Sequence, residues 1–366
     1  MKYVSLGLTR DRALYISGLT KHQYYHRPKK GKRGAKPSTT TVYKGVTVEN
    51  AWVVTSIADI HKDPDLTYGY HKMTKALKIQ GFEIGKHKVY RLMKENNLLQ
   101  KKYKRKVIQH AQYRRVIPLS PYELIEMDIK FQWLENIRAH AYIFTIIDVF
   151  SRKVLKWHAG LSITQHTVAD IWTEVITDYL QPLDLLKKGV NIEVRNDNDP
   201  RFKAKSVQQF FADNKLNQVF THPYTPQENG HIESFHAILG RSLDQRLFFD
   251  LDDLAHHLTL FYEKYNNIRL HCSIASLPPN IYLDQWNLGN IILCVDTINR
   301  KVKTKLKIPY SLIQLSGNEN WREASCTDSK PLDRVEKQNY LKVNDAITNQ
   351  PSVHRSPSVA SCNANL

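Results

Sequence analysis

The sequence has few of the features that typify secreted or membrane proteins. Its four cysteines, Cys272, Cys294, Cys326 and Cys362, lie far apart in the last third of the chain. Because zinc sites and disulfide scaffolds need closely paired cysteines, we expect reduced thiols. No run of about 18 apolar residues could cross a bilayer, and residues 1–7 lack the long apolar stretch of an export signal. We therefore expect a protein that stays inside the cell and binds no membrane.

Acidic residues are scarce in the first third of the chain. Residues 1–115 hold 26 Lys and Arg against 7 Asp and Glu, a net charge of +19, whereas the rest holds 27 against 28, a net charge of −1. A soluble segment this basic attracts polyanions. The composition indicates nucleic-acid binding by the front of the chain, although a basic tail can also serve solubility alone.

Two stretches of the basic front predict short paired helices. Residues 10–27 suit two helices with a turn at Ser17 and Gly18, and residues 49–99 suit three helices, the last starting near Lys86. A small helical bundle with solvated cations is the alternative, but two such stretches flanking a basic linker favour helix-turn-helix DNA binding. The candidate DNA contacts are Lys29, Lys30, Lys32 and Arg33 in the linker and Lys86, Lys88 and Arg91 in the last helix.

From Pro121 onward, strands alternate with helices. Three consecutive strand candidates, at 124–131, 140–149 and 153–161, precede alternating helices and strands up to residue 221, and two long helices follow. This order predicts an α/β fold, a ribonuclease-H-like mixed-sheet core preceded by a helical DNA-binding region. The predicted parts are 1–36 with the first helices and basic linker, 45–107 helical, 118–285 the core, 286–327 a small extension with a β element, and 328–366 a disordered tail.

Three acidic residues of the core suit one metal site. Alternation along 124–131 puts Asp128 on the face opposite the apolar residues, together with Glu126 and Lys130. Asp197 follows a strand, where α/β sheets expose functional groups, and Glu233 lies one turn into a helix. Each acid alone could be an ordinary surface residue. Together they suit two Mg²⁺ ions about 3.5–4 Å apart, which promote in-line attack on a DNA phosphodiester.

Six motifs in order resemble one known family. They are YGYHKMTKAL with KVYRLMKENNLL, then MDIK, FTIIDVFSRKVLKW, VRNDNDPRF, YTPQENGHIESFHAIL and YNNIRLHCSIASLPPNIY. Residues 10–283 are similar to the second-frame product of insertion-sequence-three type bacterial elements, whose core belongs to the retroviral-integrase superfamily of DDE recombinases. The resemblance implies a transposase in which Asp128, Asp197 and Glu233 bind two Mg²⁺ or Mn²⁺ ions. It also implies cleavage that exposes a 3′-OH, which then attacks a second DNA.

Other positions of the resemblance imply supporting roles. Asp148 and Arg152 match a strand corner, where a turn-stabilising salt bridge is an alternative to a catalytic role. Asn229 is expected to cap the helix of Glu233. The closing motif with Tyr265, Asn266, Arg269 and His271 would pack the last helix or contact DNA.

Three positions depart from the family pattern. Lys130 stands where the family usually has Thr, Asp199 where it has Gly, and Gly240 where a DNA-contacting Lys is common. Arg241, next to Gly240, is a candidate substitute for that Lys. The departures affect efficiency more than mechanism, because the three acids are intact.

The resemblance also implies partners. These are the terminal repeats of the element, target DNA, further copies of the chain in a synaptic complex, and a small upstream-frame DNA-binding protein, all in the bacterial cytoplasm. Two alternatives remain: an inactive relic that regulates by binding DNA, and a nuclease of the same fold that cuts without joining. The intact acids argue against the first, and the two helix-turn-helix stretches argue against the second.

Overall fold

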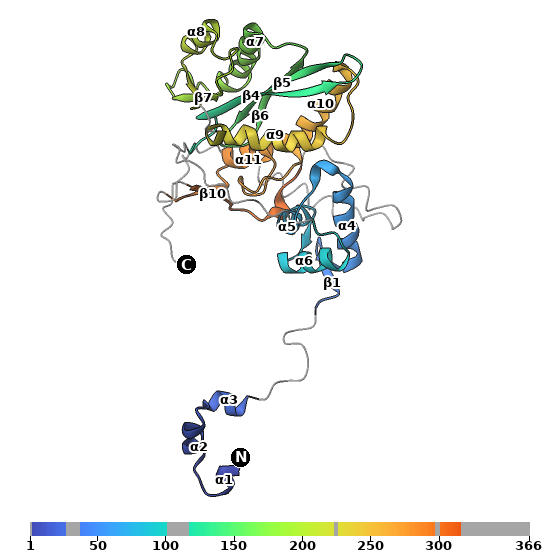
Figure 1. Cartoon of the computed structure of the whole chain (residues 1–366), viewed down its shortest axis with the longest axis vertical. Helices are drawn as coiled ribbons and strands as arrows, with labels where there is room; N and C mark the ends of the chain where they lie inside the picture. The colour runs from blue at the N-terminus through green and yellow to red at the C-terminus, as the bar shows by residue number, and fades with distance from the viewer. Residues whose placement is uncertain (1, 27–36, 101–116, 223–225, 297–300, 316–366) are drawn as a thin grey trace. The chain divides into compact units, whose positions relative to one another are not determined.

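The computed structural model describes residues 2–26, 37–100, 117–222, 226–296 and 301–315. They belong to two compact units, Met1–Thr39 and Thr40–Leu366 (Figure 1). No helix in these ranges is both long and apolar enough to span a membrane. The predicted linker contacts Lys29, Lys30, Lys32 and Arg33 and the predicted tail 328–366 lie outside the described residues.

The first unit consists of short helices. They are α1 (Lys2–Ser5), α2 (Arg10–Ser17) and α3 (Lys21–Tyr25). Gly18 ends α2 with a φ of 66°, a left-handed conformation that favours glycine. Thr20 and Gln23 then form a capping box at the start of α3. The predicted helix pair with its turn at Ser17 and Gly18 is confirmed.

The second unit begins with a helical region whose apolar faces form one core. Its helices are α4 (Asn50–Lys62), η1 (Pro64–Leu66), α5 (Tyr70–Ile79) and α6 (Lys86–Glu95), and the three predicted long helices are confirmed. The sequence did not reveal an accompanying antiparallel sheet of β1 (Thr40–Tyr43), β2 (Val46–Glu49) and β3 (Phe82–Glu83). Strands this short depend on pairing with residues distant in the sequence, which leaves little local pattern.

The core of the second unit is a five-stranded mixed sheet. Strands β4 (Leu124–Leu134), β5 (Ala139–Asp148) and β6 (Val154–Gly160) are antiparallel, whereas β7 (Ile192–Asn196) runs parallel to β4 and β8 (Leu216–Phe220) parallel to β7. The order is β6-β5-β4-β7-β8. This is the predicted ribonuclease-H-like α/β fold, with β4 at its centre.

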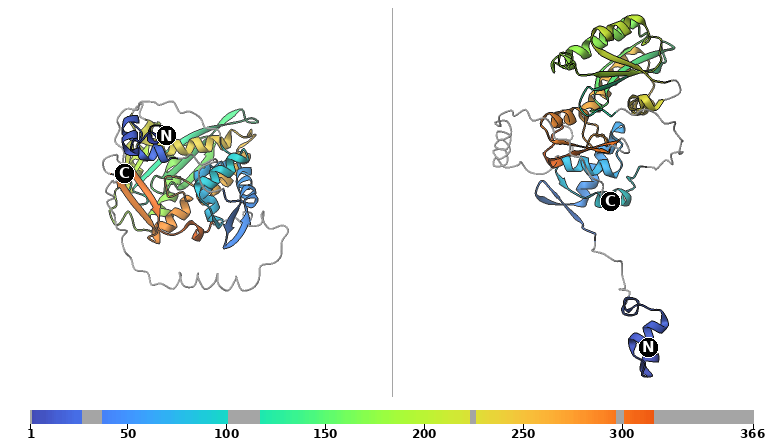
Figure 2. Two further views of the ribbon diagram at one scale, coloured as in Figure 1. Left: turned by 90° about the horizontal axis from the view of Figure 1, so that it is seen from below. Right: turned by 90° about the vertical axis from the view of Figure 1, so that its left-hand side faces the viewer.

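Helices cover both faces of the sheet (Figures 1 and 2). On one face, α7 (Gln165–Val175), continued by the π-helical turn η2 (Ile176–Leu180), and α8 (Lys205–Asp213) pack against Ile125, Met127 and Ile129 of β4. On the other lie α9 (Gly230–Leu243) and α10 (Leu251–Asn267). The even-numbered residues of β4 therefore point toward α9, as the alternation predicted.

A small C-terminal layer completes the second unit. Helix α11 (Pro279–Asn287) shares an apolar core with the hairpin of β9 (Ile291–Asp296) and β10 (Lys301–Leu306), and η4 (Tyr310–Leu312) follows. The predicted β element is present, but α11 and β9 were not predicted. Pro278 and Pro279 suggested an end of regular structure, yet proline is well suited to the first position of a helix.

Polar contacts join the helical region to the core, and we call this junction the seam. Lys264 of α10 forms ion pairs with Asp63 and Asp65 at 2.8 and 3.0 Å. The backbone N–H of Leu270 donates to the Tyr68 hydroxyl at 2.9 Å, and Arg269 donates to the backbone carbonyl of Asp65. The seam thus links η1 and the residues after it to α10 and the loop that follows.

Candidate active site

Strand β4 and helix α9 run side by side, and two residues of the strand advance about as far as one turn of the helix. Glu126 meets the first turn of α9, Asp128 contacts His236, and Lys130 lies against Gly240. Two strand residues advance about 6.7 Å and four or five helical residues about 6–7.5 Å, so every second residue of β4 meets the next turn of α9. Three polar side chains are thereby presented in a row to the helix.

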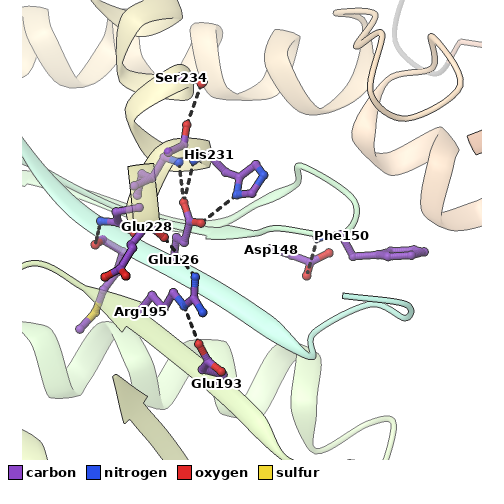
Figure 3. A network of polar contacts seen from close by, with 12 residues as sticks. Glu126, Asp148, Phe150, Glu193, Arg195, Glu228, His231 and Ser234 are labelled. Carbon is purple, nitrogen blue, oxygen red and sulfur yellow. Dashed lines mark hydrogen bonds and ion pairs between the residues drawn. The ribbon is translucent and has the colours of Figure 1, made fainter. Parts of the chain in front are cut away.

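Glu126 anchors the start of α9. Its side chain is fully buried, and one carboxylate oxygen accepts hydrogen bonds from the backbone N–H groups of His231 and Ile232 at 3.0 and 2.8 Å (Figure 3). The other oxygen lies 2.8 Å from His231 Nδ1. A carboxylate suits this place because the first turn of a helix has free N–H groups and a partial positive charge. Asn229 occupies the N-cap position, as predicted, but its side chain makes no cap hydrogen bond.

A buried arginine ties the loop before α9 to the sheet. Arg195 of β7 donates to the Glu193 carboxylate at 2.5 Å and to the backbone carbonyl of Glu228 at 3.3 Å (Figure 3). Glu228 belongs to η3 (Pro226–Asn229), and its carboxylate accepts the backbone N–H of His222 at 2.9 Å. The end of β7 and the start of α9 are thus held near each other.

The three predicted acids lie on adjoining elements. Asp128 is in β4, Asp197 directly follows β7, and Glu233 is in the first turn of α9. Glu126 and Arg195 are the last paired residues of the parallel β4–β7 register, and Asp128 and Asp197 each lie two residues beyond them. The charge of Asp128 contributes to the raised pKa of Asp197, so the two carboxylates lie within electrostatic range of each other.

The pKa values of Asp197 and Glu233 are raised by desolvation and, after it, by neighbouring negative charge. Burial raises the pKa of Asp197, and the charges of Asp128 and Asp199 raise it further, against an opposing hydrogen bond from the Asp199 backbone. Burial likewise raises the pKa of Glu233, with additional contributions from Asp128 and Glu126. Asp128 therefore lies within electrostatic range of both other acids.

The donor set suits a hard divalent cation. Carboxylate oxygens are the ligands that Mg²⁺ and Mn²⁺ prefer, and a cation would offset both the desolvation and the repulsion that raise the pKa values of Asp197 and Glu233. Within the described ranges, no three His, Cys, Asp or Glu side chains are already arranged around a common metal position. The acids fit such an ion by chemistry and by neighbouring placement.

His236 is a site residue that the sequence analysis missed. Its Nδ1 lies 3.2 Å from Asp128 Oδ2, and its buried Nε2 has no hydrogen-bond partner in the part of the chain that the structure describes. The available signal was its spacing: His236 is three residues beyond Glu233, and residues three apart share a helix face. A motif search restricted to acids passes over it.

Two departures from the family pattern are neighbours in space. The Lys130 ammonium lies 3.4 Å from the point that a Cβ on Gly240 would occupy, and Lys130 has no ion-pair partner among the described side chains. Lys130 rather than Arg241 thus puts a positive charge beside Gly240. It also lies on the same face of β4 as Asp128.

The remaining predicted DNA contacts differ in their surroundings. Lys86 is exposed at the start of α6 and Arg241 is exposed near the end of α9. Lys88 donates to the backbone carbonyl of Thr40, and Arg91 forms an ion pair with Glu95 at 3.4 Å. Their contact with DNA stays a prediction.

Asp148 serves the turn between β5 and β6. It is fully buried and accepts hydrogen bonds from the backbone N–H groups of Tyr122 and Ser151 at 3.0 and 2.8 Å and from the Ser151 hydroxyl at 2.5 Å. These contacts stabilise the turn through Ser151 and Tyr122, whereas the predicted salt bridge between Asp148 and Arg152 stays a prediction. In the closing motif, Asn266 exchanges hydrogen bonds with the backbone of Val154 at 3.0 and 2.9 Å and so packs α10 against β6.

Two regions of the second unit match known domain families. Residues 118–226 and 214–279 match two models of the integrase core domain, and residues 49–107 match a helix-turn-helix-like domain. An uncharacterized 39.2 kDa protein of insertion element IS476 from Xanthomonas euvesicatoria is 22% identical over 274 residues, covering 74% of this chain and 71% of the relative. The putative transposase InsK of insertion sequence IS150 from Escherichia coli K12 is 21% identical over 249 residues, covering 64% and 84%.

Among solved structures, the chain is similar to one in the structure of the simian T-cell lymphotropic virus intasome in complex with PP2A regulatory subunit B56 gamma. It is 13% identical, with 62% of this chain and 72% of that chain covered and a TM-score of 0.38. The matched domains and the insertion-element relatives are more informative. The chain contains an integrase core domain behind a helix-turn-helix-like domain, and it is similar to proteins of bacterial insertion elements.

Proposed function

We propose that the protein cuts the ends of an insertion sequence and joins each exposed 3′-OH to target DNA, with divalent ions held by Asp128, Asp197 and Glu233. The observation that carries this proposal is the placement of three acids on adjoining elements, with Asp197 and Glu233 within electrostatic range of Asp128. Desolvation, and after it the charge of Asp128, raises the pKa of both Asp197 and Glu233. Structural ion pairing would lower carboxylate pKa values instead. A group of acids in which Asp128 pairs only with a histidine, and in which Asp197 and Glu233 form no ion pair with a described side chain, suits metal binding.

The acids and the residues around them would have different roles in the reaction. Bound Mg²⁺ or Mn²⁺ would supply activation of the attacking oxygen and stabilisation of the leaving one. Asp128, Asp197 and Glu233 would offer hard oxygen ligands, and His236 would hold the Asp128 carboxylate through its Nδ1 contact. Glu126 would keep α9, and with it Glu233, in place beside β4.

The basic front supports DNA as the partner. The helix-turn-helix-like region would bind the terminal repeats, and the net charge of +19 over residues 1–115 would contribute affinity for any duplex. Synapsis of two ends requires more than one copy of the chain. We therefore propose a homomultimer on DNA, assisted by the upstream-frame protein of the same element.

A strand-transfer assay tests the function. The substrate is a labelled duplex carrying the terminal repeat, incubated with Mg²⁺ and a target plasmid, with EDTA in the control. We expect 3′-end nicking and joined products that EDTA abolishes. Binding without nicking would identify the inactive relic, and nicking without joined products would identify a nuclease.

Lys130 is expected to contact a DNA phosphate beside the acids. Because its ammonium has no ion-pair partner among the described residues and lies against Gly240, Lys130→Thr should slow nicking about tenfold, the equivalent of about 1.4 kcal/mol. Adding Gly240→Lys should restore most of the rate by supplying the charge from α9. Nicking rates at saturating Mg²⁺ measure both effects, and a double variant as slow as Lys130→Thr would refute the phosphate contact.

A further inference from the structure

Positive charges gather at the seam between the helical region and the core. Arg269, in the loop after α10, is buried, and its Nε has no hydrogen-bond partner within the described residues. The Lys72 ammonium of α5 lies 5.7 Å from the ring centre of Tyr68. Because the Tyr68 hydroxyl accepts the backbone N–H of Leu270, Lys72 and Arg269 border the same tyrosine.

A third cation lies within electrostatic range of these two. Helix α9, which carries Arg241, packs against η1, and η1 contains Asp65, the residue whose carbonyl accepts a hydrogen bond from Arg269. The charge of Arg241 lowers the pKa values of both Lys72 and Arg269. Arg241 lies near the C-terminal end of α9 and is exposed. Lys72, Arg241 and Arg269 thus come from three segments far apart in the sequence.

These cations lack a carboxylate of their own. None of the three forms an ion pair with a described side chain, and Asp65, the nearby acid, is paired with Lys264 at 3.0 Å. Burial lowers the pKa of Lys72, and Arg269 and Arg241 lower it further, although Cys272 opposes the shift. Burial also lowers the pKa of Arg269, to which Arg241 adds, although Asp65 and two tyrosines oppose the shift.

The neighbouring histidine carries no charge that could offset these cations. His271 is buried, and burial followed by the charges of Arg269, Lys72 and Arg152 holds its pKa well below the ordinary value, so its ring is neutral. Like charges in a partly desolvated place are costly unless an anion joins them. Guanidinium and ammonium groups together match the oxygens of a phosphodiester.

We propose that Lys72, Arg241 and Arg269 bind one phosphate of the DNA backbone where the helix-turn-helix-like region meets the integrase core. The proposal rests on the proposed function and adds the place where DNA crosses from one region to the other. Arg241 is eight residues beyond Glu233, about 12 Å along the helix axis, or three to four base pairs at about 3.4 Å each. DNA held at this site therefore reaches the acids.

The test is the salt dependence of DNA binding by the full-length protein. A labelled terminal-repeat duplex is titrated in EDTA, which prevents cleavage, over a range of KCl concentrations. The variants are Lys72→Gln, Arg241→Gln and the double variant. The matched control is Lys187→Gln, which removes one charge from an exposed lysine paired with Asp184.

One shared phosphate has a definite signature. Each neutralised phosphate contributes about 0.9 to the log–log slope, so the double variant should flatten the slope by about 0.9 and each single variant by no more than that. Lys187→Gln should leave the slope unchanged. A loss of about 1.8 in the double variant would mean two separate contacts, and slopes like that of the control would mean a purely structural cluster; either result overturns the proposal.

The experiment separates this inference from the proposed function. Binding in EDTA does not depend on cleavage, so a protein that never cuts could still show the expected slopes. If the wild-type protein cuts and joins DNA but the variants show unchanged slopes, the proposed function stands and the proposed phosphate site at the seam is wrong. Arg241 is exposed, so we expect its variant to melt like wild type, and a change in slope cannot then reflect unfolding.

Discussion

Replacing Asp197 by Asn is expected to slow Mg²⁺-dependent nicking on the order of a thousandfold while leaving DNA binding intact. Asn keeps the size of the side chain. It can still accept the hydrogen bond that the backbone N–H of Asp199 donates to Asp197 Oδ1 at 3.1 Å in the wild-type structure. It lacks the charge that would hold a divalent ion. The measurement is 3′-end nicking of a labelled terminal-repeat duplex, with a gel shift on the same protein.

The other two acids should behave as one unit with Asp197. Asp128→Asn and Glu233→Gln are expected to give similar losses, and double variants should be little worse than single ones, because losing one ligand disables the site. Asp199→Asn is the matched control, since its carboxylate pairs with Arg201 at 2.6 Å. If Asp197→Asn nicks like wild type, or loses folding and DNA binding together with nicking, the metal assignment is wrong.

Removing the Glu126 carboxylate should damage both stability and catalysis. Glu126→Ala leaves the backbone N–H groups of His231 and Ile232 without acceptors in a buried place, which should lower the free energy of unfolding by about 3 kcal/mol. The start of α9 would then be free to shift, and Glu233 with it. We expect nicking per folded molecule to fall more than tenfold, a loss of about 1.4 kcal/mol or more.

The conservative variant distinguishes positioning from charge. Glu126→Gln keeps one oxygen that can accept both backbone N–H groups, so it should retain substantial nicking and most of the stability. Urea denaturation gives the stability, and the Mg²⁺ concentration for half-maximal nicking reports the position of Glu233; it should rise in Glu126→Ala only. Equal Mg²⁺ requirements in Glu126→Ala and wild type would leave Glu126 with a structural role alone.

Local patterns were enough to place the candidate acids on their elements. Alternation along β4 put Glu126, Asp128 and Lys130 on one face, and the end of a short strand placed Asp197. The turn before α9 placed Glu233 in its first turn. Each of these inferences depends on residues close in sequence, where backbone periodicity decides which way a side chain points.

The contacts between elements could not be predicted in this way. The rule that Asn caps helices favoured Asn229, but a carboxylate 105 residues from His231 in sequence, that of Glu126, takes the N–H groups instead. The contact of His236 with Asp128 likewise exists only after α9 has packed on β4. Such pairings follow from tertiary packing, which overrides local preference.

The seam also bears on how the cut site would be chosen. Lys264, Arg269 and Leu270 hold the segment around η1 against α10, so the helix-turn-helix-like region and the acids keep a set separation. Under the proposed function, the protein would act as a molecular ruler. The cut would fall at a constant distance from the bases bound by α6. If a base pair were inserted between those bases and the end of the element, the cut would keep its distance from the bound bases and would therefore miss the end of the element.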